Sequence, residues 1–303
     1  MIEKVLITGA NAGLGKEAAK QLAEQSDITK IYLGCRNRDK AIAAKRELEA
    51  MTQRKIFEIL LIDVSNLDSV KQAVSEISEP IDALIMNAGG TGGANFNRVN
   101  QYGATEIFSA NMLGHAQLAQ QLINEGKLTQ IALYAGSEAA RGVEEMGMKR
   151  PNLNDSSIDE FAAIINGTKY PEAKDPTISY GPIKYMGALW MSAMARKHST
   201  IRFITMSPGA TTGTEGFNTL PLVKQWVMKG MMQVMQWAGK VHGVEQGAAR
   251  YIDGLYNLEL KSGGFYASQK GLSGPIDDQS KLFPDIGNTN YQDNAYQAIQ
   301  RFL

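Results

Sequence analysis

The sequence predicts an α/β fold in which a doubly wound parallel sheet of about seven strands is flanked by helices. Short apolar runs alternate with longer helical patterns over the first two-thirds of the chain. These runs are rich in Val, Ile and Leu without strict polar alternation, which is typical of parallel strands buried on both faces. No internal repeat or low-complexity linker divides the 303 residues, so we predict one domain over residues 1–303.

The expected elements follow from these runs in chain order. Strands are expected at Lys4–Thr8, Lys30–Gly34, Ile56–Ile62, Ala83–Met86, Ile131–Tyr134 and Ile201–Met206, with a late strand at Gly264–Ala267 closing the far edge. Helices are expected between them at Gly15–Glu24, Lys40–Met51, Leu67–Ile77 and Asn100–Asn124. Residues 141–179 depart from this alternation, because they are rich in Gly, Pro, Asn, Asp and Glu and offer one short helix, Ile158–Ile165. We interpret 141–179 as an insertion.

Composition narrows the class of protein. Lys and Arg total 31 and Asp and Glu total 31, which argues against nucleic acid or an anionic membrane as the main partner. The single cysteine, Cys35, excludes an internal disulfide and fits a reducing compartment. The N-terminus lacks a secretory pattern, and the apolar window 220–238 is interrupted by Lys224, Lys229 and Gln233, which makes it too polar to span a bilayer. We expect a cytoplasmic protein with no transmembrane span.

A glycine-rich loop follows the first strand and precedes the first helix. Glycines let the chain turn tightly, let the backbone approach a pyrophosphate and let the helix pack close to the strand. The helix N-terminus offers unpaired N–H groups to phosphates. The alternative is a plain glycine-rich turn, but the order of strand, loop and helix favours a nucleotide site made by Gly9, Asn11, Ala12, Gly13, Leu14 and Gly15.

The end of the second strand indicates which nucleotide binds. An acidic residue there suits the ribose diol of NAD, whereas an arginine suits the 2′-phosphate of NADP. Arg36 and Asn37 occupy these positions, and no carboxylate occurs until Asp39. We therefore favour NADP(H) over NAD(H); the alternative is that Arg36 is a solvated surface residue.

Within residues 168–190 the motif Tyr-x-x-x-Lys occurs twice, as Tyr170 with Lys174 and as Tyr180 with Lys184. On a helix this spacing puts a phenol and an ammonium on one face. The first pair lies in the proline-containing insertion, where residues before proline avoid helical geometry. Pro182 is expected in a first helical turn, where proline is tolerated, and an apolar helix follows. The sequence therefore favours Tyr180 and Lys184 as the acid/base pair.

Taken in order, these motifs resemble those of the short-chain dehydrogenase/reductase family over nearly the whole chain. Each is weak alone, but their order on the expected elements is specific. The stretch Gly34–Asn37 and the long gap before Tyr180 are similar to the retinol dehydrogenase, protochlorophyllide reductase and carbonyl reductase branches. The matching positions are the turn 8–15, Asp63 and Val64, Asn87, Ala88 and Gly89, Asn111, Ser137, Tyr180 with Lys184, and Pro208 and Gly209.

The resemblance implies a Rossmann-like sheet with NADP(H) across the carboxyl ends of its strands. It assigns the pyrophosphate to residues 9–15 and the nicotinamide end to the Pro208–Gly209 turn with Thr212 or Thr214, between which the sequence does not choose. The adenosine half is assigned to Asp63, Val64, Asn87, Ala88 and Gly89.

The same resemblance implies the chemical roles. Tyr180 is the general acid or base, and Lys184 bonds the nicotinamide ribose and, together with the positively charged oxidised ring, lowers the pKa of Tyr180. Ser137 binds the substrate oxygen, and Asn111 holds a water that links Lys184 to solvent. From the residues alone, Ser137 is equally a turn or cap residue, and Asn111 a buried hydrogen-bond partner.

The long connection between Ser137 and Tyr180, 43 positions apart, departs from simple family members. We expect the insertion to lie near the active-site mouth, along the helix that many relatives use to pair subunits, so that the protein is a monomer or dimer. Residues 210–240 are expected to form a substrate lid, or alternatively a helix docked on the core. Methionines in this segment favour an apolar substrate; they are Met228, Met231, Met232 and Met235.

Three functions are therefore weighed. The leading one is an NADP(H)-dependent carbonyl reductase or alcohol dehydrogenase acting on an apolar small molecule. The second keeps the cofactor and Tyr180 but reduces a carbon–carbon double bond of an enone. The third is a regulatory protein that senses NADP(H) without turnover. We expect no metal, because His115, His198 and His242 lack metal-ligand spacing and are structural or exposed.

Overall fold

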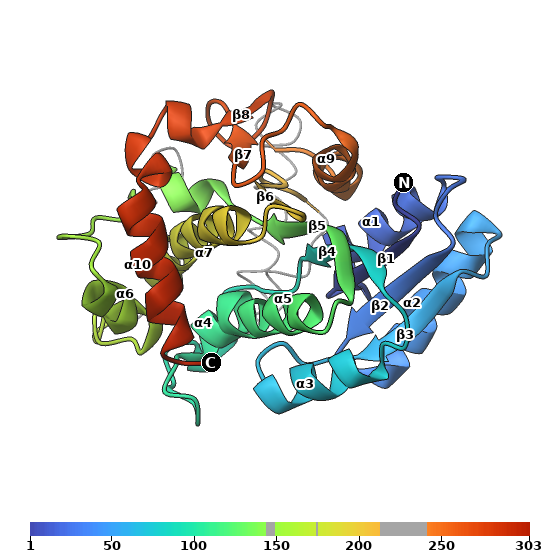
Figure 1. Ribbon diagram of the computed structural model, residues 1–303, viewed down its shortest axis with the longest axis horizontal. Helices are drawn as coiled ribbons and strands as arrows, with labels where there is room; N and C mark the ends of the chain where they lie inside the picture. Colours follow the sequence, from blue (N-terminus) through green and yellow to red (C-terminus); the bar gives the residue numbers. More distant parts are fainter. Residues whose placement is uncertain (144–148, 174, 213–240) are drawn as a thin grey trace, which may run out of the picture.

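A computed structural model describes residues 1–143, 149–173, 175–212 and 241–303. The described residues form one eight-stranded sheet (Figure 1). Its strands are β1 (Lys4–Thr8), β2 (Lys30–Cys35), β3 (Phe57–Leu61), β4 (Ile81–Met86), β5 (Leu128–Ala135), β6 (Arg202–Met206), β7 (Phe265–Ser268) and β8 (Ile276–Asp278).

The strand order is β3-β2-β1-β4-β5-β6-β7-β8. Neighbouring strands from β3 to β7 are parallel, and β8 pairs with β7 in the antiparallel sense. The chain reverses its direction of travel across the sheet between β1 and β4. At such a switch point the connections leave to opposite sides, and a crevice opens at the carboxyl ends of the strands.

All seven expected strands are confirmed, and the first one has the expected bounds. The expectation that the late strand closes the far edge is wrong, because β8 adds one more strand beyond β7. The sequence of β8 is Ile-Asp-Asp, and so short a run with a single apolar residue carries no periodic signal.

The expected helices are also found, with shifted ends. The helices that flank the sheet are α1 (Gly13–Ala23), α2 (Arg38–Thr52), α3 (Leu67–Glu76), α5 (Gly114–Asn124), α7 (Thr177–Lys197) and α9 (Val244–Tyr256). Two further helices, α6 (Ile158–Ile165) and α10 (Thr289–Gln300), pack on α7. The expected bounds of α6 are confirmed.

The helix expected over Asn100–Asn124 starts later than expected. Its first helical turn is α4 (Glu106–Phe108), which continues through a π-helical turn at Ser109–Leu113 into α5. Residues before α4 form a turn instead, because the Asn100 side chain accepts a hydrogen bond from the N–H of Tyr102 at 3.0 Å and Gly103 has φ 76°. Asn and Gly favour such turns over a helix start.

The two faces of the sheet carry separate hydrophobic clusters. Along β1, Leu6 points into one cluster while Val5 and Ile7 point into the other, which is the period-two alternation of a strand buried on both sides. Helices α1, α2 and α9 cover the face of Val5 and Ile7. Helices α3, α5 and α7 cover the face of Leu6.

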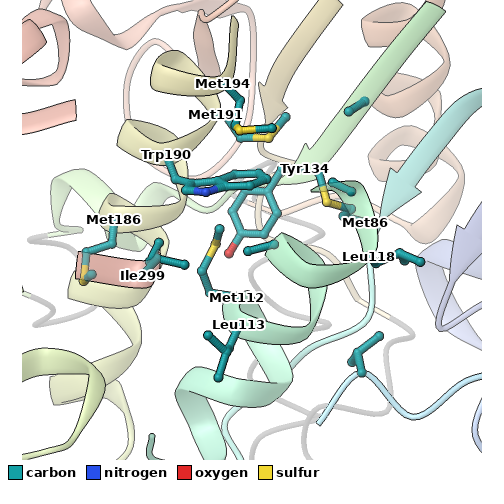
Figure 2. Packing of buried hydrophobic residues seen from close by; sticks show 14 of the residues in the cluster. Met86, Met112, Leu113, Leu118, Tyr134, Met186, Trp190, Met191, Met194 and Ile299 are labelled. Carbon is teal, nitrogen blue, oxygen red and sulfur yellow. The ribbon is translucent and has the colours of Figure 1, made fainter. Parts of the chain in front are cut away.

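Most of the α7 helix is buried on every side. Each residue from Gly181 to Met194 is buried, because the sheet lies on one side of the helix and α10 and α6 lie on the other (Figure 1). Figure 2 shows the ring of Trp190 beside Tyr134, with thioether side chains around both. These flexible side chains fill the irregular space between the two rings, and they are Met86, Met112, Met191 and Met194.

The insertion is organised around one carboxylate. Glu160 of α6 accepts hydrogen bonds from three consecutive backbone N–H groups, of Asn154, Asp155 and Ser156, and its Oε1 lies 2.6 Å from Nζ of Lys169. These donors lower the pKa of Glu160 to about 2 although burial acts in the opposite direction. The Glu160 carboxylate therefore provides an acceptor for three backbone N–H groups, and these hydrogen bonds stabilise a segment rich in loop-forming residues.

Some expectations fall on residues that the structure does not describe. Of the expected lid at 210–240, residues 213–240 lie outside the described part, including Thr214 and the four methionines of that segment. Lys174 also lies outside it. In the helices that the structure does describe, none is long and apolar enough to cross a membrane.

Candidate active site

The loop between β1 and α1 has the geometry of a phosphate cradle. Gly9 has φ 68° and Gly13 has φ 53°, a backbone conformation that side chains with a Cβ rarely adopt. A Cβ at Gly15 would collide with the carbonyl oxygen of Gly9. All three glycines are therefore required by the local path of the chain.

The N-terminus of α1 has free donors. Its N-cap residue, Ala12, is extended, and in the described part of the chain no side chain caps the helix or places an acid in its first turn. By contrast, the side chains of Asn37 and Asn66 cap α2 and α3. Free N–H groups at the positive end of a helix dipole, beside backbone that can approach closely, fit a pyrophosphate.

The end of β2 is positively charged. Arg36 and Arg38 are both exposed, and within the described residues the guanidinium of Arg36 has no ion pair or hydrogen bond. Asn37 has a structural role, since its Oδ1 accepts the N–H of Lys40 at 2.9 Å as the N-cap of α2. Cys35 is buried, and burial raises the pKa of its thiol to about 11. A cation without a carboxylate partner fits a 2′-phosphate.

The loops after β3 and β4 reach the same edge of the sheet. Asp63 is half-buried, and its Oδ1 accepts from the N–H and hydroxyl of Ser65 at 2.9 and 2.6 Å. Val64 lies directly against α5, because a Cβ at Gly114 would overlap the Val64 carbonyl oxygen. The glycine thus lets α5 pass close to the loop that carries Asp63 and Val64.

Thr8 anchors the loop after β4, a role that motif reading missed. Its Oγ1 accepts the N–H groups of Asn87 and Ala88 at 2.9 and 3.0 Å, and Asn87 Nδ2 donates back to the Thr8 carbonyl at 2.9 Å. His115 Nε2 lies 3.0 Å from the same hydroxyl, and His115 Nδ1 lies 3.3 Å from the Asn111 backbone oxygen. Burial lowers the pKa of His115 to about 3, so the ring is neutral and structural. Nδ1 then carries the proton and Nε2 accepts from Thr8, which satisfies every partner.

Asn111 is fully buried in the π-helical turn and holds the next part of the same loop. Its Oδ1 accepts the Gly90 N–H at 3.1 Å, and its Nδ2 donates to the carbonyls of Gly90 and Ile107 at 2.7 and 2.8 Å. Gly89 has φ 155° and lies so close to Oδ1 that a Cβ would collide with it. The Asn111 side chain is therefore a buried hydrogen-bond partner of the backbone.

Tyr180 lies in the first turn of α7. The helix begins at Thr177, so Pro182 falls in its second turn, and the expectation of a first-turn proline is wrong. Pro182 has no N–H group, so the carbonyl of Ile178 lacks its helical hydrogen bond. Ile178 is 47% exposed and therefore open to water. Tyr170, in contrast, lies in a turn after α6 and outside any helix.

Lys184 is buried one turn further along α7. Its Nζ donates to the Ala135 carbonyl at 2.8 Å and lies 5.6 Å from the centre of the Tyr180 ring. Among the described residues, no carboxylate forms an ion pair with it. Burial lowers the pKa of Lys184 to about 7, because desolvation disfavours the ammonium.

Ser137 follows β5 and meets Tyr180 across the site. Its Oγ accepts the N–H of Ala139 at 3.2 Å, so it caps the short helix Glu138–Arg141. Burial raises the pKa of Tyr180 to about 12, and a hydrogen bond with Ser137 opposes this rise. The net shift is upward, because desolvation disfavours the phenolate of the half-buried Tyr180, and the lowering expected from Lys184 together with the oxidised cofactor ring stays a prediction.

The turn after β6 completes the edge. Gly209 has φ 74°, and Thr212 donates from both its N–H and its hydroxyl to the His242 carbonyl at 2.9 and 3.3 Å. The Nε2 atom of His242 lies 2.6 Å from the Pro208 carbonyl oxygen. Within the part of the chain described here, no group of three His, Cys, Asp or Glu residues could hold a metal ion.

The comparisons with known proteins agree with this geometry. A family model described as short chain dehydrogenase matches residues 3–139. The chain is 27% identical over 261 residues to "Short chain dehydrogenase rstn4" of Aspergillus nomiae, which covers 82% of this chain and 67% of that protein. It is 29% identical over 239 residues to the chloroplastic protochlorophyllide reductase B of Hordeum vulgare, over 69% of this chain and 56% of that protein. The chain thus spans about two thirds of the first relative and little more than half of the second.

Among solved structures, the NADPH-bound carbonyl reductase from chicken fatty liver superposes with a TM-score of 0.59 at 18% identity, covering 90% of this chain and 99% of that one. This likeness concerns the fold. The ordered motifs, the glycine-rich loop before α1, the Tyr180–Lys184 helix and the matched model together support membership of the short-chain dehydrogenase/reductase family.

Proposed function

We propose that this protein is an NADP(H)-dependent oxidoreductase that reduces a carbonyl group, or oxidises an alcohol, of an apolar small molecule. One observation carries the proposal: Tyr180 lies near enough to Ser137 for the serine to lower its pKa, and one helical turn from the buried Lys184, whose Nζ is 5.6 Å from the centre of the Tyr180 ring. A substrate oxygen between the Tyr180 and Ser137 hydroxyls would receive a proton from one and a hydrogen bond from the other.

The chain offers a coherent set of cofactor contacts. Residues 9–15 would hold the pyrophosphate, and Asp63 and Val64 would bound the adenine. The loop of Asn87, Ala88 and Gly89 would lie along the adenosine ribose, Lys184 would bond the nicotinamide ribose, and the turn from Pro208 to Thr212 would border the nicotinamide. When bound, the cofactor supplies or accepts the hydride.

The proton chemistry depends on Tyr180 and Lys184. With its pKa raised to about 12, Tyr180 is protonated at neutral pH and can act as the acid in carbonyl reduction. In alcohol oxidation the same residue must first lose this proton, which a nearby positive charge favours. The pKa of Lys184 is about 7, so its side chain is positively charged in acidic solution and neutral in alkaline solution. It therefore supplies the nearby positive charge only at the lower pH.

Two features support the choice of cofactor and substrate. The unpaired Arg36 at the end of β2 favours a 2′-phosphate. The similarity to a protein named protochlorophyllide reductase favours a large, apolar substrate, and it keeps reduction of a carbon–carbon double bond as the second candidate.

The test is turnover of NADPH with a panel of apolar aldehydes, ketones and enones. Tyr180→Phe should lower kcat by at least about a hundredfold, because a general acid contributes this much. Tyr170→Phe, which alters the neighbouring Tyr-x-x-x-Lys motif at residues 170–174, should leave kcat within about twofold. Product analysis separates loss of the carbonyl from loss of the alkene. Binding of NADPH without turnover of any compound would instead favour a sensing role, and full activity of Tyr180→Phe would overturn the proposal.

A further inference from the structure

A buried carboxylate follows Ser137 directly in the sequence. The side chain of Glu138 is 4% exposed. Its Oε2 accepts the hydroxyl of Ser207 at 2.6 Å, and its Oε1 accepts the N–H and the hydroxyl of Ser268 at 3.1 and 2.9 Å. Glu138 follows β5, Ser207 follows β6, and Ser268 is the last residue of β7. One carboxylate therefore ties together the ends of three neighbouring strands.

Arg250 of α9 balances the charge of Glu138. Its Nη1 lies 3.6 Å from Glu138 Oε1. The guanidinium also donates to the Ser207 carbonyl, the Ser268 hydroxyl and the Gly274 carbonyl at 3.2, 3.1 and 2.9 Å. A buried ion pair loses much of its attraction to desolvation, so its presence is weak evidence of a stabilising role. Its position between the loops of the site suggests a functional one.

The network reaches both sides of the site. On one side, Glu138 begins the short helix that Ser137 caps, so the carboxylate anchors the peptide next to the Ser137 hydroxyl. On the other side, Ser207 donates its hydroxyl to Glu138 and accepts the N–H of Gly209 at 3.1 Å. The carboxylate thus sets the start of the Pro208–Thr212 turn as well as the Ser137 loop.

We propose that Glu138 is a positioning residue of the reaction, whose carboxylate holds the Ser137 loop beside Tyr180 in register with the Ser207–Gly209 turn. This inference rests on the proposed function. Fixing two hydroxyl donors toward one substrate oxygen is what preorganisation requires, and small displacements of such groups lower rates strongly.

The charge of Glu138 also acts on Tyr180. After burial, which is the main cause, the negative charge of Glu138 contributes to the raised pKa of Tyr180. Other titratable groups face this pair from the elements packed around it, and they are Lys184 of α7, Tyr134 of β5, Arg250 and Tyr251 of α9, and His242 before α9. None of these groups is altered when Glu138 is substituted, so a change in the pKa of Tyr180 on that substitution reports on Glu138.

The experiment separates charge from geometry with two substitutions. Glu138→Gln removes the charge and keeps the size, whereas Glu138→Asp keeps the charge and shortens the reach. The matched control is Glu160→Gln, which neutralises another buried, ion-paired carboxylate in the insertion, where Oε1 lies 2.6 Å from Lys169 Nζ. A fluorinated tyrosine incorporated at position 180 ionises at lower pH than tyrosine, and its absorbance can be titrated without cofactor or substrate.

We expect Glu138→Gln to lower the midpoint of this titration by about 0.5–1 pH unit, a three- to tenfold change in the ionisation constant. Glu138→Asp should shift it by less than half as much, and Glu160→Gln should leave it unchanged. In turnover with NADPH, both Glu138 variants should lower kcat by about tenfold or more with smaller changes in KM, and Glu160→Gln should stay within about twofold.

An unchanged midpoint in Glu138→Gln together with an unchanged kcat in Glu138→Asp would overturn the inference. If Glu138→Gln does not fold, the kcat of Glu138→Asp is the deciding measurement: a decrease of about tenfold supports the inference, and an unchanged kcat overturns it. Absence of turnover in the wild-type protein would refute the proposed function, while the titration would still show whether Glu138 acts on Tyr180.

Discussion

The ammonium nitrogen of Lys184 lies 4.7 Å from the centre of the Tyr134 ring, and the hydroxyl of that ring donates to the Asn111 backbone oxygen at 3.0 Å. Tyr134 therefore joins the lysine of the site to the π-helical turn through two different interactions. The face of the ring attracts the cation, and its hydroxyl satisfies a buried carbonyl. Two substitutions separate these contributions.

Tyr134→Phe keeps the ring and removes the hydroxyl. We expect the free energy of unfolding to fall by about 1 kcal/mol, the net value of one buried hydrogen bond, since the Asn111 oxygen keeps its contact with His115. Tyr134→Leu also removes the ring and should cost about 3 kcal/mol or more through the lost packing and the lost cation–π contact. Urea unfolding at pH 7 measures both. Equal losses would show that the ring contributes nothing beyond its hydroxyl.

Burial of Lys184 should make stability depend on pH. Its pKa is about 7 in the folded protein and 10.5 as the ordinary value, so between these pH values the unfolded chain binds more protons than the folded one. The free energy of unfolding should therefore rise as the pH increases from about 7 toward 10.5, by at most roughly 5 kcal/mol. Below pH 7 the lysine is charged in both the folded and the unfolded state, so the full free-energy cost of burying its charge lowers the stability of the folded protein.

Lys184→Met isolates this effect from other titrating groups. The variant should be more stable than wild type at pH 7 by a few kcal/mol, and the difference should shrink as the pH rises toward 9.5. Urea unfolding of both proteins in the same buffers measures it without cofactor. A difference that stays constant over this range would contradict the lowered pKa of Lys184.

Cofactor preference should depend on the charge at the end of β2. Arg36→Asp should weaken NADPH binding by about tenfold or more, because a hydrogen bond between charged groups is replaced by repulsion, and it should leave NADH binding equal or tighter. Isothermal titration with each nucleotide measures the change. Arg46→Asp is a matched control, since Arg46 is an exposed arginine further along α2. Equal effects of the two substitutions would point to general electrostatics and would remove the assignment of NADP(H).

Because α10 and α6 cover the α7 helix, we expect this helix not to form a subunit interface. Residues Gly181–Met194 are buried by α10 and α6 on the side away from the sheet, so this helix has no free face with which to pair with a second copy. We expect light scattering after size exclusion to give a mass near the 33.0 kDa of one chain. A stable mass of four chains would show that assembly uses another surface and would contradict the expected effect of the insertion.

Local sequence signals determined much of the framework. The apolar runs located seven of the eight strands, and the glycines at positions 9, 13 and 15 marked the tight turn between β1 and α1, because strand periodicity and left-handed backbone are local properties. The prolines beside Tyr170 and the apolar run after Pro182 together indicated that Tyr180, and not Tyr170, lies on a helix. The edge strand β8 was missed, because its three residues depend on pairing with β7.

Tertiary structure alone decided how the site residues interact. It brought Ser137 to Tyr180 across 43 positions, and it occupied the Asn111 side chain with the Gly90 backbone. It also set the upward shift of the Tyr180 pKa, because desolvation depends on atoms packed around the phenol from other elements. For the same reason the strand-tying role of Glu138 has no motif: its partners are 69 to 130 positions away in the chain. A one-dimensional pattern records which groups are present, whereas burial and contact between distant segments set their charge and their geometry.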